Sequence, residues 1–147
     1  MKSSAFIGVA LLLTCSGSAM AVDCSQATQI GNTGTTTIRN TLGGKTVCAK
    51  HSSDSWQEYH LVGGLAGGVL VDYKMGANHS TDPSKQVGTW ATSGTGANSV
   101  ITYNYGPGQS YTYELHLSNG IYTFCGRNGA PNIDVIQLKV GLTSCGF

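Results

Sequence analysis

Charge is scarce in this sequence, and no region of it is strongly basic. The 147 residues include 8 Lys+Arg and 7 Asp+Glu. Proteins that bind nucleic acid usually carry a basic stripe, and proteins that bind anionic lipid carry clustered Lys and Arg. Neither feature is present in the sequence. We therefore expect no nucleic-acid partner and no electrostatic binding to a membrane surface.

The sequence also lacks the patterns of long helices and of common catalytic sites. No stretch combines helical periodicity with capping residues, and the 21 glycines argue against long helices. There is no G-x-S-x-G elbow, no H-E-x-x-H motif and no C-x-x-C pair. We therefore expect a protein that is not an enzyme, binds no metal and needs no cofactor.

Two chemical alternatives remain open on residue type alone. Glu58 and Glu114 provide two carboxylates, which glycoside cleavage needs at a set separation, although their phase suggests the polar side of strands. The histidines lack the compact spacing of a zinc motif, so solvent-facing positions are the simpler interpretation, although strands can bring distant ligands together. The four histidines are His51, His60, His79 and His116.

Long apolar runs are absent except at the N-terminus. There, Lys2 precedes the apolar stretch Ala5–Thr14, and small residues follow up to Ala21. This order predicts a secretory signal peptide over residues 1–21, too short to span a bilayer and cleaved after Ala21. The alternative is a lipoprotein, because Leu12-Leu13-Thr14-Cys15 resembles a lipobox with Thr14 at its small-residue position. Either route predicts a secreted or periplasmic protein without a membrane span.

Four cysteines remain after cleavage, and their even number predicts two disulfides in an oxidising compartment. They allow three connectivities, which the sequence leaves open. Lys2 leaves with the signal peptide, so seven basic and seven acidic residues remain and the mature chain has no formal net charge. The cysteines expected to be paired are Cys24, Cys48, Cys125 and Cys145.

Alternating short runs of β-branched and aromatic residues fill most of the mature chain. In the stretch 87–125, four such runs are separated by Gly, Asn, Ser and Pro, which predicts a β-meander. Tyr103 and Tyr105 share one face of their run, and Tyr111 and Tyr113 share one face of the next. In the last strand, the alternation shifts by one residue near Val135-Ile136, which predicts a β-bulge.

The complete pattern predicts about eight antiparallel strands. A meander of this size avoids open edges by closing into a small barrel over residues 42–147, with a two-sheet β-sandwich as the alternative. Residues 22–41 are expected to form a polar N-terminal arm, with a possible edge strand at Thr35–Ile38. Gly63–Gly68 is expected to be a flexible turn whose Leu65 and Ala66 are buried rather than exposed.

Local motifs add two resemblances. Gly88-Thr89-Trp90 resembles the G-x-W element of calycin barrels such as lipocalins and avidins, although it lies in the middle of the chain and not on the first strand. More widely, segments such as Leu42–Cys48 and Tyr122–Cys125 resemble a group of small exported bacterial proteins of uncharacterised role. The first resemblance implies a ligand-binding barrel, and the second implies no function.

Aromatic residues carry the functional prediction. Tyr combines apolar area with a hydroxyl group, so a cluster of Tyr and Trp either fills a barrel or lines a binding pocket. We expect a non-catalytic protein that binds a small or extended ligand, such as a saccharide, an aromatic metabolite or a peptide. The alternative is a protein-interaction or structural role, as an enzyme inhibitor, a surface component or a self-assembling subunit. The expected ligand-binding residues are Trp56, Trp90, Tyr103, Tyr105, Tyr111 and Tyr113.

Overall fold

A computed structural model describes residues 23–72 and 84–146 of the chain. The predicted signal peptide over residues 1–21, with Cys15, lies outside the described residues, and so does His79. Within the described residues, no helix has the length and apolar character needed to cross a membrane.

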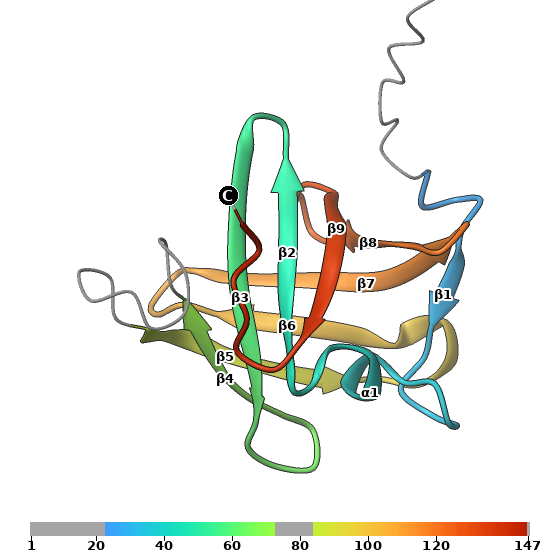
Figure 1. Cartoon of the computed structure of the whole chain (residues 1–147). Helices are drawn as coiled ribbons and strands as arrows, with labels where there is room; N and C mark the ends of the chain where they lie inside the picture. Colours follow the sequence, from blue (N-terminus) through green and yellow to red (C-terminus); the bar gives the residue numbers. More distant parts are fainter. Residues whose placement is uncertain (1–22, 73–83, 147) are drawn as a thin grey trace, which may run out of the picture.

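Eight antiparallel strands close into a barrel, which confirms the predicted fold class (Figure 1). The strand order runs from β7 through β6, β5, β4, β3, β2 and β9 to β8, and the pairing of β7 with β8 closes the ring. All pairings between neighbours are antiparallel, so the sandwich alternative is not the fold. The strands are β2 (Lys45–His51), β3 (Asp54–Val62), β4 (Gly67–Asp72), β5 (Lys85–Ser93), β6 (Val100–Asn104), β7 (Ser110–Ser118), β8 (Ile121–Gly126) and β9 (Ile133–Val140).

A ninth strand, β1 (Thr28–Ile30), extends the barrel wall in the segment that was expected to be an arm. It pairs with β7 between Leu115 and Leu117, whereas β6 pairs with the earlier part of β7, between Ser110 and Tyr113. The two short strands β6 and β1 thus pair with successive parts of β7. The side chain of Ile30 is buried in the core, so this segment contributes to the packing of the barrel.

The predicted edge strand at Thr35–Ile38 is wrong, because the chain bends there and then enters helix α1 (Ile38–Leu42). Thr37 caps the helix, since its hydroxyl oxygen accepts a hydrogen bond from the Asn40 backbone N–H at 3.1 Å. Ile38 and Leu42 are fully buried, one helical turn apart on the same face. The helix therefore packs its apolar face into the end of the barrel where β2 begins (Figure 1).

The predicted β-bulge in the last strand is confirmed. Cys48 pairs with Gln137 and Ala49 pairs with Val135, which leaves Ile136 as the extra residue of β9. The bulge explains why the alternation of apolar residues changes phase at this point.

The glycine-rich connection between β3 and β4 differs from its prediction in two respects. Leu65 at the tip is 99% exposed and Ala66 is exposed as well, so the expected burial of both residues is wrong. Gly67 and Gly68 belong to β4, where an added Cβ atom would lie 2.0 Å from the carbonyl oxygen of Trp90 and 1.8 Å from that of Leu61. These two glycines therefore allow the close approach of neighbouring backbones.

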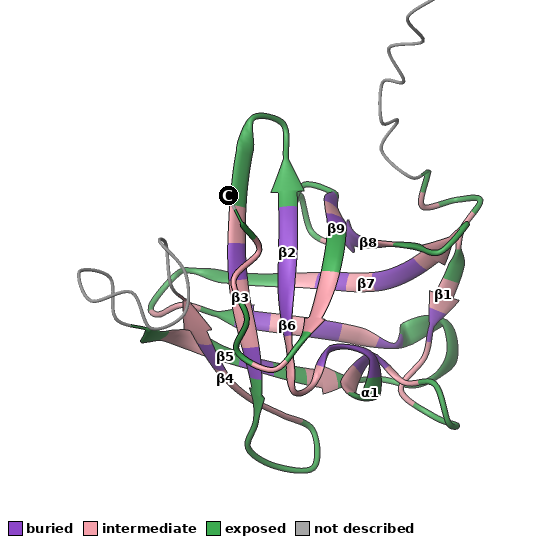
Figure 2. Ribbon diagram, viewed as in Figure 1, coloured by how far each residue is buried: buried purple, intermediate pink, exposed green. Residues whose placement is uncertain are grey.

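Strand β2 is buried along its centre, as Figure 2 shows, because the chain after β9 covers its outer face. The Thr46 hydroxyl donates to the carbonyl oxygen of Gly141 at 2.7 Å, and the Cys145 N–H donates to the side-chain oxygen of Gln57 at 2.6 Å. The Cys48–Cys145 disulfide fixes this C-terminal segment. A second disulfide, Cys24–Cys125, joins the N-terminal segment to β8. Two disulfides were predicted, and the structure supplies their connectivity.

Candidate functional site

The two ends of the barrel are filled differently. At the end where β2 begins, the apolar face of α1 and side chains such as Leu70 and Leu115 pack without solvent exposure. Toward the other end, the barrel encloses a cavity of about 250 Å³. Six aromatic residues contribute to its wall, namely Trp56, Tyr103, Tyr105, Tyr111, Tyr113 and Phe124.

Five of the six predicted ligand-binding residues therefore surround one cavity, because alternate positions on β3, on β7 and along β6 up to Tyr105 point into the barrel. Trp90, the sixth, does not line the cavity but is buried beneath it. Its ring centroid lies 5.4 Å from that of His60, and its indole N–H donates to the Leu61 carbonyl oxygen at 3.3 Å. The structure thus shows that five of the predicted residues lie around one cavity, whereas a role in ligand binding remains a prediction for all six.

Sequence reasoning missed the two polar members of the cavity wall. Glu58 and His60 were expected on a solvent-facing side of their strand, but both line the cavity, and His60 is 1% exposed. The signal was present in the period of two, which places both side chains on the same face of β3 as Trp56. We expected these two side chains to face solvent because polar and charged side chains are seldom buried.

His60 is held in one tautomer by its two hydrogen-bond partners. Its Nδ1 lies 3.2 Å from the backbone carbonyl oxygen of Glu58, which can only accept, so Nδ1 carries the proton. Its Nε2 lies 2.9 Å from the Tyr103 hydroxyl, which then donates to it. Desolvation disfavours the imidazolium and lowers the pKa of His60 to about 4. His60 is therefore neutral near pH 7.

Burial shifts the pKa of the Glu58 carboxyl group in the opposite direction, upward. Desolvation favours its protonated form and raises its pKa to about 7, although the Tyr105 hydroxyl donates to Oε2 at 2.9 Å. The charge of Asp72, directly across the β3–β4 pair, raises it further. Burial and the nearby Glu58 in turn raise the pKa of Tyr105, so this tyrosine remains a hydrogen-bond donor.

The aromatic rings form a continuous cluster. Tyr103 contacts the rings of Tyr105, Tyr113 and Phe124, with centroids 6.4, 5.9 and 5.7 Å apart. Tyr105 in turn lies 6.2 Å from Tyr111, which is 42% exposed. The cluster thus leads from the buried core to the surface and gives the cavity rigid walls.

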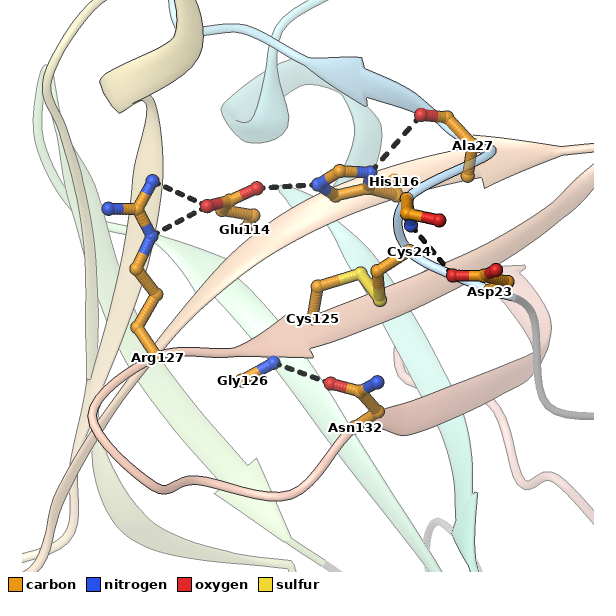
Figure 3. The surroundings of a disulfide bond; sticks show 10 residues. Asp23, Cys24, Ala27, Glu114, His116, Cys125, Gly126, Arg127 and Asn132 are labelled. Carbon is orange, nitrogen blue, oxygen red and sulfur yellow. Dashed lines mark hydrogen bonds and ion pairs between the residues drawn. A yellow bond between two sulfur atoms is a disulfide. The ribbon is translucent and has the colours of Figure 1, made fainter.

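A second polar cluster lies on the outside of the barrel, near the Cys24–Cys125 disulfide (Figure 3). Glu114 accepts hydrogen bonds from Arg127 and from His116, each at 2.6 Å. His116 also contacts the carbonyl oxygen of Ala27 at 3.3 Å, just before β1. These contacts connect β7, the loop after β8 and the N-terminal segment, and they account for the cluster without a ligand.

The position of Glu114 decides against the carboxylate pair considered above. Glu114 alternates with Tyr113 and Leu115, which point inward, so it lies on the opposite side of the barrel wall from Glu58. The two carboxylates share no cleft.

The described histidines are also dispersed: His51 is exposed, whereas His116 is buried, contrary to its expected solvent-facing position. Among the described residues, no group of three or more His, Cys, Asp and Glu side chains is placed to hold a metal ion.

The chain matches no protein-family model, no curated protein and no solved structure. The two resemblances noted from the sequence therefore remain predictions. In the structure, the Gly88-Thr89-Trp90 element has a packing role, since a Cβ atom on Gly88 would lie 2.5 Å from the Asn104 carbonyl oxygen. Trp90 itself is 2% exposed.

Proposed function

We propose that the mature protein is exported and binds a small ligand, without chemical conversion, in the aromatic cavity of its barrel. The observation that carries this proposal is the cavity of about 250 Å³ walled by aromatic rings, at one end of a barrel whose other end is packed. Small-molecule sites combine apolar walls with a few polar groups, as the aromatic rings and Glu58 do here. The two disulfides fit an extracellular or periplasmic location.

Two measurements test this function. Native mass spectrometry of protein purified from its own source, recorded beside the reduced and denatured mass, should reveal a small co-purified ligand. In addition, 2-phenylethanol, as a neutral aromatic probe, should cause saturable NMR shift changes at Tyr113 and Trp56. Trp56→Ala should weaken this binding, whereas Leu65→Ala, at an exposed tip remote from the cavity wall, should not.

The proposal fails if the purified protein carries no extra mass and if neutral, cationic and anionic aromatic probes all cause no saturable change at the cavity. Equal binding by wild type and Trp56→Ala would place the probe elsewhere and would also contradict it.

A protein-interaction role is the second candidate, and the exposed apolar tip of the β3–β4 connection favours it. Leu65 is 99% exposed, and the neighbouring Leu61 and Val62 are 44% and 39% exposed. Apolar side chains gathered at one place on a surface often mark a protein contact. Sedimentation velocity over a range of concentrations tests this role. Association that Leu65→Ser abolishes would support it, and a monomer at all concentrations would exclude self-assembly through this tip.

A further inference from the structure

Among the described residues that line the cavity, Glu58 is the one acidic residue, and no Lys or Arg accompanies it. In the described part of the chain, the side chain of Glu58 accepts a hydrogen bond from the Tyr105 hydroxyl, a neutral donor. Asp72, which pairs with Glu58 across β3 and β4, carries a charge of the same sign. The barrel thus holds a carboxyl group in a largely apolar wall without a positive partner from the wall.

His60 cannot supply that positive charge. Its two ring nitrogens are already used, since Nδ1 faces the Glu58 backbone carbonyl and Nε2 accepts from Tyr103. The ring is also enclosed between Trp90 and Tyr103, with centroid distances of 5.4 and 5.6 Å. Protonation would place the second proton of the ring on Nε2 and reverse the hydrogen bond with Tyr103, whose hydroxyl would then have to accept. Among the described residues, none in the cavity wall supplies a positive partner for the Glu58 carboxylate, so this role is open to a ligand.

The aromatic walls favour the same kind of ligand group. The faces of Tyr and Trp rings attract cations, and the attraction grows when the site excludes water. Trp56, Tyr105 and Tyr111 line the cavity together with Glu58, and the last two rings lie 6.2 Å apart. A carboxylate surrounded by aromatic rings suits an ammonium group, which forms a charge-assisted hydrogen bond with the oxygen and cation–π contacts with the rings.

We propose that the cavity binds a compact ligand carrying a protonated amine on an apolar or aromatic body, with the ammonium group paired to Glu58. This inference deepens the proposed function and rests on it. Aralkylamines and the N-terminal residue of a short apolar peptide both fit this description. In each, the ammonium group can contact Glu58 and the apolar body next to it can contact the aromatic rings. The cavity of about 250 Å³ has room for a single aromatic ring with a short chain, not for a large ligand.

The test compares three probes that share a phenyl body and differ in their charged group: phenethylamine, 2-phenylethanol and 3-phenylpropionate. Isothermal titration calorimetry at pH 8 should show phenethylamine bound at least about tenfold more tightly than 2-phenylethanol, with 3-phenylpropionate the weakest. Glu58→Gln should remove the preference for the amine and leave binding of the alcohol within about threefold. Asp54→Asn, which removes one negative charge from the exposed start of β3, should retain the preference.

The pH dependence gives a readout that a merely structural role of Glu58 would not produce. Among the described residues, the titratable groups facing Glu58 are His60 on its own strand, Asp72 on β4, Tyr103 on β6, Tyr105 directly after β6, and Tyr113 on β7. Because the pKa of Glu58 is about 7 without ligand, phenethylamine must displace its proton at lower pH. Affinity for phenethylamine should fall roughly tenfold per pH unit below 7, while affinity for 2-phenylethanol should stay level.

The outcomes separate this inference from the proposed function. Binding of 2-phenylethanol or 3-phenylpropionate as tight as that of phenethylamine would overturn the amine inference and leave the ligand-binding function intact. The same holds if Glu58→Gln retains the preference for the amine. If none of the three probes binds and the purified protein carries no small molecule, both proposals fall.

Discussion

Glu58 and His60 lie two positions apart on β3 and line one cavity, yet desolvation shifts their pKa values in opposite directions. Each group is kept in its neutral form, since desolvation penalises a carboxylate and an imidazolium alike. In the folded protein Glu58 holds a proton up to about pH 7, and His60 lacks one down to about pH 4. The two residues therefore affect stability with opposite slopes.

The sign of each contribution follows from proton binding in the folded and unfolded states. The pKa of Glu58 rises from 4.5 to about 7 on folding, so its contribution is complete below pH 4.5 and is lost as the pH rises to 7. The pKa of His60 falls from 6.5 to about 4, so its contribution is complete above pH 6.5 and is lost as the pH falls to 4. At 1.36 kcal/mol per pKa unit, each amounts to about 3 kcal/mol at most.

Replacing Glu58 by Gln should expose the His60 contribution. The free energy of unfolding of Glu58→Gln should rise between pH 4 and pH 6.5, while wild type should change less because its two contributions oppose each other. The difference between wild type and variant should fall by up to about 3 kcal/mol from pH 4.5 to pH 7. Urea unfolding at half-unit steps of pH measures both quantities.

Glu114→Gln provides a control of opposite sign. Partial burial opposes ionisation of Glu114, but hydrogen bonds from His116 and Arg127 outweigh it and lower the pKa of this carboxyl. Its contribution is therefore present above pH 4.5 and lost as the pH falls. The free energy of unfolding of wild type, relative to that of Glu114→Gln, should therefore increase as the pH rises. A stability difference for Glu58→Gln that is independent of pH would contradict the buried environment assigned to Glu58.

At the scale of elements, α1 is short enough to depend on its cap and its packing. A five-residue helix has almost no stability of its own, so the Thr37 cap and the burial of Ile38 and Leu42 must hold it in place. Arg39 adds a link, since its guanidinium donates to the Gly64 carbonyl oxygen at 2.6 Å.

Thr37→Ala should lower the free energy of unfolding by about 1 kcal/mol, because the Asn40 N–H loses its side-chain acceptor. Thr37→Ser retains a hydroxyl and should stay within a few tenths of wild type. Urea unfolding gives the stabilities, and hydrogen exchange at the Asn40 amide gives the local effect. Equal exchange in the alanine and serine variants would show that the Thr37 hydroxyl does not cap this helix.

The sequence allowed the strands to be predicted but not α1, and the reason lies in the length of each pattern. Strands such as β3 and β7 span nine residues, enough for several alternations between the two faces. Helix α1 covers one turn and a fraction, so its apolar pair Ile38 and Leu42 cannot be told from chance. Strand β1 has three residues and is equally short for a pattern.

The candidate site was predictable in its aromatic part for the same reason. Tyr103 on β6 pairs with Tyr111 on β7, and Tyr105 and Tyr113 each follow two residues later, so their convergence inside a barrel follows from the period of two. Glu58 was not predicted, because the alternation only assigns it to a face and cannot show that this face encloses a cavity. The closure of the barrel, through the pairing of β7 with β8, is a long-range property that no local pattern contains.

At the scale of the whole molecule, the two disulfides tie both chain ends to the barrel. Cys24–Cys125 joins the segment before β1 to β8, and Cys48–Cys145 joins β2 to the last residues. Their sequence separations are 101 and 97, so the chain entropy that each removes from the unfolded state is nearly the same. Loop length alone therefore predicts equal contributions from the two cross-links.

Removing either disulfide by paired Cys→Ala substitution should lower the free energy of unfolding by about 2–4 kcal/mol. In the Cys48→Ala/Cys145→Ala variant the C-terminal segment should remain partly attached to the barrel. The Thr46 hydroxyl and the backbone N–H of residue 145 can still donate their hydrogen bonds there. Urea unfolding with and without reducing agent measures the effect. Wild type under reducing conditions should approach the variant lacking all four cysteines, whose own stability should not respond to the reductant. A wild-type protein that is indifferent to reduction would show that these cross-links do not stabilise the barrel.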